Sequence, residues 1–222
     1  MLRQSYGNRG LNRLDIEIKN ALFEKGVDIV RFVDISELPR KQTKGFTKAI
    51  VFGIALSKKF ILDKYNDLPA EHDDFAEKEH KCDELSNWLA KYIKQKKYRV
   101  LQKIGFNGKT KSSRLPHKTI ARLAGIGYIG KNNLLITEEY GCAFVIGIAI
   151  TNAPVSTGKY DLLPSKCGDC DACKIICPTN AIYGNEWTQN GGRDKVIDVF
   201  KCECCLKCMI FCPHTLKYAN KN

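Results

Sequence analysis

The chain has 222 residues, a formal net charge of +12, 44% hydrophobic residues and eleven cysteines. This length allows one sizeable core with a small appended module, or two domains. The longest apolar runs, residues 49–56 and 142–150, fall well short of the roughly 20 residues that a membrane-spanning helix needs. Because the N-terminus lacks the apolar stretch of a secretory signal, we expect a cytoplasmic protein whose cysteines bind metal.

The first part of the chain alternates helical and extended patterns. Apolar residues recur at helical spacing from Leu11 to Lys25, and Gly26 follows at the position where helices often end. Two apolar, β-branched stretches, Val27–Asp34 and Ala49–Leu56, predict buried strands with a basic loop between them. Gly53 inside the second stretch indicates a bend or a close approach to the backbone.

A long helix is predicted from Pro69 to Tyr98, with an apolar stripe along one side. Its first half is acidic and its second half is basic, which suits the helix dipole. His72 and His80 lie among charged residues, so we expect both at the surface. Cys82 lies on the apolar stripe and is expected to be a buried thiol.

The window from Leu85 to Thr137 contains no Asp or Glu but twelve lysines and arginines. Such a block of positive charge is typical of a surface that meets an anion, such as tRNA, a phosphorylated cofactor or an acidic partner. A solvated, lysine-rich helix surface explains the same block. The sequence leaves both interpretations open.

Three further elements are expected before the cysteine-rich end. They are a short helix over Leu115–Ala124, a glycine-rich loop that leads into a strand ending at Ile136, and a buried strand over Cys142–Thr151. A linker follows. We therefore predict an α/β (α+β) domain with a mixed sheet over residues 1–160 and a separate module over residues 161–222.

The glycine loop has the spacing G-x-G-x-x-G, formed by Gly125, Gly127 and Gly130. In a dinucleotide-binding fold this motif follows a strand and opens a helix, whereas a strand is expected after it here. The dinucleotide interpretation is therefore poor. Backbone N–H groups beside the glycines could still cradle a phosphate or an amide-rich ligand, with Lys131 adding positive charge.

Two matched cysteine runs dominate the end of the chain. Both fit C-x2-C-x2-C-x3-C-P, the ligand run of bacterial two-cluster ferredoxins, in which the fourth cysteine binds the other cluster. A zinc ribbon uses four ligands in two pairs, and a disulfide framework needs an oxidising compartment, so both alternatives fit less well. We assign cluster one to Cys167, Cys170, Cys173 and Cys212, and cluster two to Cys202, Cys205, Cys208 and Cys177.

The stretch from about Ala121 to Pro213 resembles the epoxyqueuosine reductase family, which is related to the corrinoid reductive dehalogenases. The glycine loop, the strand that ends at Ile150 and both cysteine runs carry this resemblance, in the same order and spacing. It implies an N-terminal domain that binds cobalamin base-off, with two [4Fe-4S] clusters delivering electrons to cobalt. Carried over, the corrin site would be lined by Gly125, Gly127, Gly130, Lys131 and Asn132.

Two features depart from the family pattern. The family places a proton-donating Asp before the glycine loop, and at that distance this chain has Lys111. We also expect no tRNA-binding helical-repeat extension, because nine residues follow Pro213. His117, close before the loop, is a candidate proton donor in place of the acid. An exposed turn histidine after Pro116 is the alternative.

The sequence therefore favours a cytoplasmic iron-sulfur oxidoreductase. Electrons would come from a low-potential donor of ferredoxin or flavodoxin type, pass through both clusters and reduce cobalamin for an epoxyqueuosine-reductase-like reaction. The alternative is a ferredoxin-like electron-transfer protein that reduces a partner protein and has no substrate of its own.

Overall fold

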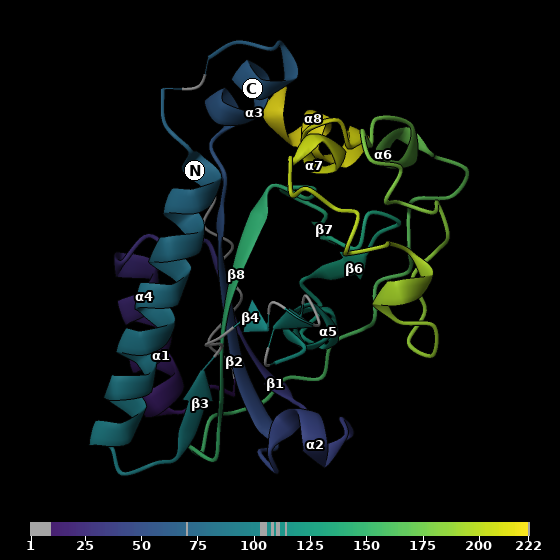
Figure 1. Ribbon diagram of the computed structural model, residues 1–222. Helices are drawn as coiled ribbons and strands as arrows, with labels where there is room; N and C mark the ends of the chain where they lie inside the picture. The colour runs from purple at the N-terminus through teal and green to yellow at the C-terminus, as the bar shows by residue number, and fades with distance from the viewer. Residues whose placement is uncertain are drawn as a thin grey trace.

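The computed structural model describes residues 10–221 except residues 70, 103–105, 108, 110, 111 and 114. Its centre is a four-stranded antiparallel sheet in the order β1-β2-β8-β3 (Figure 1). All eight residues of β8 are buried, as expected for a central strand covered on both faces. The strands are β1 (Ile29–Asp34), β2 (Lys48–Ala55), β3 (Val100–Gln102) and β8 (Phe144–Thr151).

The sheet is antiparallel in its three strand pairings, in place of the mixed sheet that we predicted. One isolated bridge, from Val33 to Gly158, is parallel. The connection between β1 and β2 carries only the four-residue helix α2 (Arg40–Thr43). Parallel neighbours need a longer, usually helical crossover, so this short connection returns the chain antiparallel.

Helices and a hairpin cover the two faces of the sheet. Successive residues of β2 point to opposite sides of the sheet, and a core cluster lies on each side. Phe52 belongs to the first cluster, under α1 (Arg13–Glu24) and α4 (Asp74–Gln95), and Val51 belongs to the second. The second cluster lies under α5 (His117–Leu123) and the hairpin of β6 (Gly127–Ile129) and β7 (Leu135–Thr137). Figure 1 shows these groups on opposite sides of the sheet.

Local sequence signals account for several helix ends. Asn12 and Asp15 form a reciprocal capping box at the start of α1. Gly26, with φ +85°, follows its last turn, as predicted. The long helix α4 begins at Asp74, later than predicted, because Asp73 caps it. A separate helix, α3 (Lys58–Tyr65), precedes it and was not predicted.

Gly53 marks a close approach, one of the two outcomes that the sequence offered. A Cβ atom on Gly53 would lie 2.3 Å from the Phe144 ring on the neighbouring strand β8. Gly147 shows the reciprocal arrangement, because a Cβ there would lie 2.2 Å from the Phe52 ring. Each glycine therefore leaves room for an aromatic ring packed across the strand pair.

The cysteine-rich end has little regular structure. It contains α6 (Ala172–Ile175), a 3₁₀ turn (Arg193–Lys195), α7 (Lys207–Ile210) and α8 (Pro213–Ala219). Met209, Ile210 and Ala219 belong to the same core cluster as Phe52. The last helices are therefore packed against the four-stranded sheet and the elements that cover it, which we call the sheet half. A short two-stranded pair, β4 (Phe106–Asn107) and β5 (Ser112–Ser113), completes the elements. No helix in the described part of the chain is both long and apolar enough to span a membrane.

Candidate metal centre

Four cysteines drawn from both runs line a single cavity. Cys167, Cys170 and Cys173 come from the first run, and Cys212 comes from the end of the second. The structure thus brings together the set that we assigned to cluster one. The other residues that line this cavity are Lys131, Asn132, Ile136, Pro213 and His214.

The other four assigned cysteines form a second, adjoining group. Burial, followed by the nearby charges of Cys202, Cys173, Cys205 and Cys177, raises the pKa of Cys208 to about 12. Cys177, Cys202 and Cys208 also pack against one small apolar cluster. The two cysteine groups are therefore neighbours, with Cys173 and Cys208 on the sides that face each other.

The thiols differ in how readily they ionise. Burial, followed by repulsion from Cys167, Cys212 and Cys170, raises the pKa of Cys173 to about 11. In contrast, the pKa of Cys212 is lowered to about 6. The Cys142 thiol and the backbone N–H groups of His214 and Thr215 donate to the sulfur of Cys212 and stabilise its thiolate form. The surroundings thus favour the thiolate form of Cys212, whereas burial disfavours the thiolate form of Cys173 until a cation binds beside it. This donor set fits iron-sulfur clusters.

The turn of the glycine hairpin touches both cysteine runs. Lys131 Nζ donates to the Cys170 carbonyl at 3.2 Å, on the first run. Asn132 Nδ2 donates to the Cys208 carbonyl at 3.1 Å, on the second run, and to Cys142 Sγ at 3.3 Å. Both side chains are buried. Two residues that we predicted to face a corrin therefore contact the cysteine loops.

The three glycines of the loop are explained by packing within the chain. A Cβ on Gly127 would lie 2.3 Å from the Ile136 carbonyl oxygen across the hairpin, and one on Gly130 would lie 2.4 Å from the Ile136 side chain. Gly125 has φ +64°, and a Cβ there would lie 2.8 Å from Tyr160. These contacts require glycine without any ligand, so the corrin-lining role stays a prediction.

The two histidines nearest the site differ in position. His117 begins α5, where its Nδ1 lies 3.4 Å from the Leu115 carbonyl oxygen, and it is not among the residues that line the cysteine cavity. His214 does line the cavity, and its Nε2 lies 3.1 Å from the Tyr128 hydroxyl. In the sequence, the position of His214 directly after Cys212-Pro213 indicates that it lies close to a proposed cluster ligand. Lys111 lies outside the described residues.

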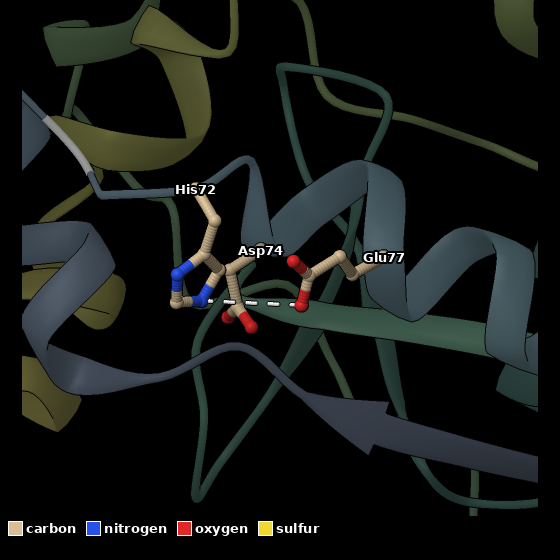
Figure 2. A group of neighbouring side chains, drawn as sticks. All are labelled: His72, Asp74 and Glu77. Atoms are coloured by element: carbon tan, nitrogen blue, oxygen red, sulfur yellow. Dashed lines mark ion pairs between the residues drawn. The ribbon is translucent and has the colours of Figure 1, made fainter.

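A group of potential metal ligands away from the cysteines has a structural explanation. His72, Asp74 and Glu77 gather at the start of α4, as Figure 2 shows, with 3.9 Å between His72 Nε2 and Glu77 Oε2. The buried Asp74 already accepts from the Ser57 backbone N–H at 2.7 Å and pairs with Lys78 at 3.2 Å. These bonds tie α4 to the cap of α3. His72 is exposed, as predicted.

The sequence comparisons find iron-sulfur and epoxyqueuosine reductase relatives. A family model for a 4Fe-4S binding domain matches residues 160–183. Over 67 residues the chain is 46% identical to the epoxyqueuosine reductase of Listeria monocytogenes. That stretch is 29% of this chain and 17% of the relative, so the matched part spans less than a fifth of the relative's length.

Solved structures share the fold over most of the chain. An epoxyqueuosine reductase with a tRNA-Tyr epoxyqueuosine-modified tRNA stem loop matches 92% of this chain and 66% of its own, with a TM-score of 0.62 and 17% identity. A reductive dehalogenase whose structure suggests a mechanism for B12-dependent dehalogenation matches 92% of this chain and 32% of its own, with a TM-score of 0.68 and 18% identity. At such identities these matches show the fold alone.

Proposed function

The chain is a relative of the epoxyqueuosine reductases, and on this premise we propose that it is an iron-sulfur oxidoreductase with two [4Fe-4S] clusters. The observation that carries the proposal is the cavity in which cysteines of both runs meet. A crossed arrangement of this kind is the geometry that the doubled ferredoxin run requires. The match of a 4Fe-4S binding domain to the first run supports it independently.

The residues around the cavity have distinct roles in electron transfer. When bound, each cluster takes up or releases one electron at a time. Cys212 lies in the core of the sheet half and fixes one corner of cluster one away from water. Cys170 of the first set and Cys205 of the second are both exposed, so a donor of ferredoxin or flavodoxin type can approach either cluster. Lys131 and Asn132 hold the two runs against one hairpin turn.

We propose cobalamin as the acceptor, because the fold is shared with a reductive dehalogenase described with a B12-dependent mechanism. The described contacts of Gly125, Gly127 and Gly130 are satisfied within the chain. Cobalamin therefore rests on the resemblance. A carrier that hands its electrons to a partner protein is the alternative, and it needs the clusters alone.

We propose an epoxyqueuosine-type reduction on tRNA as the reaction. A related fold has been solved with an epoxyqueuosine-modified tRNA stem loop, and this chain carries an acid-free basic window over residues 85–137. Lys94 and Lys97, in that window, are exposed and are available to a phosphate backbone. His117 remains the proposed proton donor.

Anaerobic reconstitution tests the core of this proposal. We expect about eight iron and eight acid-labile sulfide per chain, since eight cysteines in two cubane runs bind two clusters. Bound zinc without sulfide would overturn it.

Cobalamin binding is tested separately on the reconstituted protein. Adding cob(II)alamin should give a base-off electron paramagnetic resonance signal that saturates with protein concentration. The substitution Gly127→Val is unsuitable as a probe, because its side chain would collide with the Ile136 carbonyl and disrupt the hairpin. If no cobalamin binds at tens of micromolar, the binding free energy is about 6 kcal/mol or less in magnitude. That result would favour the alternative function, a protein that carries electrons to a partner.

A further inference from the structure

Lys131 is a buried cation beside the cavity assigned to cluster one. Its side chain is 9% exposed, and it extends from the hairpin turn between β6 and β7 to the first cysteine run. Nζ lies 3.2 Å from the Cys170 carbonyl and 3.4 Å from Asp171 Oδ1. The ammonium group is thus fixed next to the loop that bears three of the four cysteines.

The lysines near the second cysteine group are placed differently. Lys201 and Lys207, which flank Cys202 and Cys208 in sequence, are both exposed. Water and salt screen exposed charges strongly, whereas a buried charge acts through a medium of lower dielectric constant. A buried lysine therefore lies beside the first cysteine run, whereas the two lysines that flank ligands of the second run are exposed.

Asp171 opposes part of the Lys131 charge. Its side chain is 44% exposed, so solvent weakens its contribution more than that of the buried lysine. The imidazole of His214 lines the same cavity. Lys131 is therefore the only lysine or arginine in the described lining of the cavity.

We propose that Lys131 is the positioning residue that raises the reduction potential of cluster one above that of cluster two. Positive charge stabilises the reduced cluster, which carries one more negative charge than the oxidised cluster. The inference deepens the proposed function and rests on it. It assigns a direction to the electron path, from cluster two to cluster one, because electrons move toward the higher reduction potential.

The electron balance of this step is simple. One electron leaves cluster two, which passes from the 1+ to the 2+ state, and it enters cluster one, which passes from 2+ to 1+. A low-potential one-electron donor then reduces cluster two again. No proton is needed for the transfer, because the charge of Lys131 is present before the electron arrives.

A redox titration of three variants tests this role, with the two clusters monitored by electron paramagnetic resonance. Lys131→Gln removes the charge and keeps a donor for the Cys170 carbonyl. It should make cluster one about tenfold harder to reduce, which corresponds to about 59 mV for a one-electron couple. Lys131→Arg should restore most of the shift. Asp171→Asn, a nearly isosteric change on an exposed loop residue, should shift the potential in the opposite direction.

Two controls make the result specific. Cluster two is the internal reference, and its potential should change much less than that of cluster one. Lys217→Met removes the same formal charge from an exposed position on α8 and should leave both potentials within error. Cys170→Ser, a conservative ligand exchange, identifies which titration step belongs to cluster one.

The outcomes separate this inference from the proposed function. Two intact clusters in Lys131→Gln with unchanged potentials would overturn the role of Lys131 and leave the iron-sulfur assignment standing. Failure of the unmodified protein to bind iron and sulfide would overturn the proposed function itself. If Lys131→Gln binds iron poorly, the opposite shift expected for Asp171→Asn still decides the electrostatic role.

Discussion

The sheet half and the cysteine half of the molecule are held together by different means. The strand β8 is buried along its whole length, and two large apolar clusters cover the faces of the sheet. The segment between the two cysteine runs has one small buried cluster of its own. So few apolar residues cannot offset the entropy of ordering the loops, which indicates that metal binding must supply the stability there. The residues of that cluster are Ala181, Ile182, Val196 and Ile197.

The boundary between the halves runs through the second cysteine run. Cys212 is 6% exposed and belongs to the core cluster of the sheet half, whereas Cys205 is exposed. The first assigned set thus has one ligand anchored in the packed core, whereas no ligand of the second set belongs to that core. This difference makes the stability of the sheet half separable from that of the loops.

Removal of the clusters should produce the largest effect. Anaerobic chelation is expected to unfold the segment from Cys167 to Cys205 while the sheet half stays folded, since metal ligation is the main constraint on those loops. Limited trypsin digestion should then cleave at Lys174, Lys195 and Lys201, with little change in the β-sheet circular dichroism signal. A protease-resistant loop segment in the iron-free protein would contradict the contrast between the halves.

Loss of a single crossed ligand should remove about half of the iron. Cys177→Ser is expected to damage the cluster bound mainly by Cys202, Cys205 and Cys208, because the fourth cysteine of a run serves the other cluster. Iron analysis and the spectra of the reduced protein measure this loss. The matched control is Cys204→Ser, an exposed cysteine outside the assigned set, which should retain both clusters. Loss confined to cluster one would refute the crossed assignment.

Truncation in the sheet half should affect folding more than cluster binding. Ile148 is 0% exposed, so Ile148→Ala should lower the free energy of unfolding by about 2–5 kcal/mol, measured by urea denaturation. The same chemical change at Ile175, which is 82% exposed in the cysteine half, should cost less than about 0.5 kcal/mol. Equal effects at the two sites would show that the loops have a core of their own.

Cluster binding should weaken as the pH falls. The raised pKa values of Cys173, about 11, and of Cys208, about 12, mean that protons compete with iron at these sulfurs throughout the neutral range. Each ligand must lose its proton, so iron is expected to bind more tightly at pH 8.5 than at pH 6.5. Competition with an iron chelator measures this trend. A flat profile would indicate that the buried thiols are already ionised.

Charge reversal on the basic window should have the smallest effect on the protein itself. Lys94→Glu with Lys97→Glu should leave the clusters intact and flatten the salt dependence of tRNA binding, because fewer counterions are released. Arg40→Glu with Lys41→Glu, at two exposed positions in α2, changes the net charge by the same amount and serves as the control. If tRNA binding is absent or insensitive to salt, the window is ordinary helix surface.

Several local features of the fold follow from the sequence. The spacing of apolar residues and Gly26 predicted α1, and the β-branched runs predicted β1, β2 and β8 to within two residues of their observed starts. These signals are local, since side-chain periodicity and turn residues act within a few positions. The eight-residue helix α3 was missed because its apolar residues Phe60, Ile61 and Leu62 are consecutive and show no helical spacing.

The doubled cysteine run predicted the ligand set of the proposed clusters, because the ligands of a cubane have a fixed spacing along the chain. The tertiary structure decided what surrounds that site. Nothing local to Lys131 indicates that it reaches Cys170, or that Asn132 reaches Cys208. Those contacts join positions far apart in sequence, and they exist because the hairpin packs on the sheet while α7 and α8 pack into the same core.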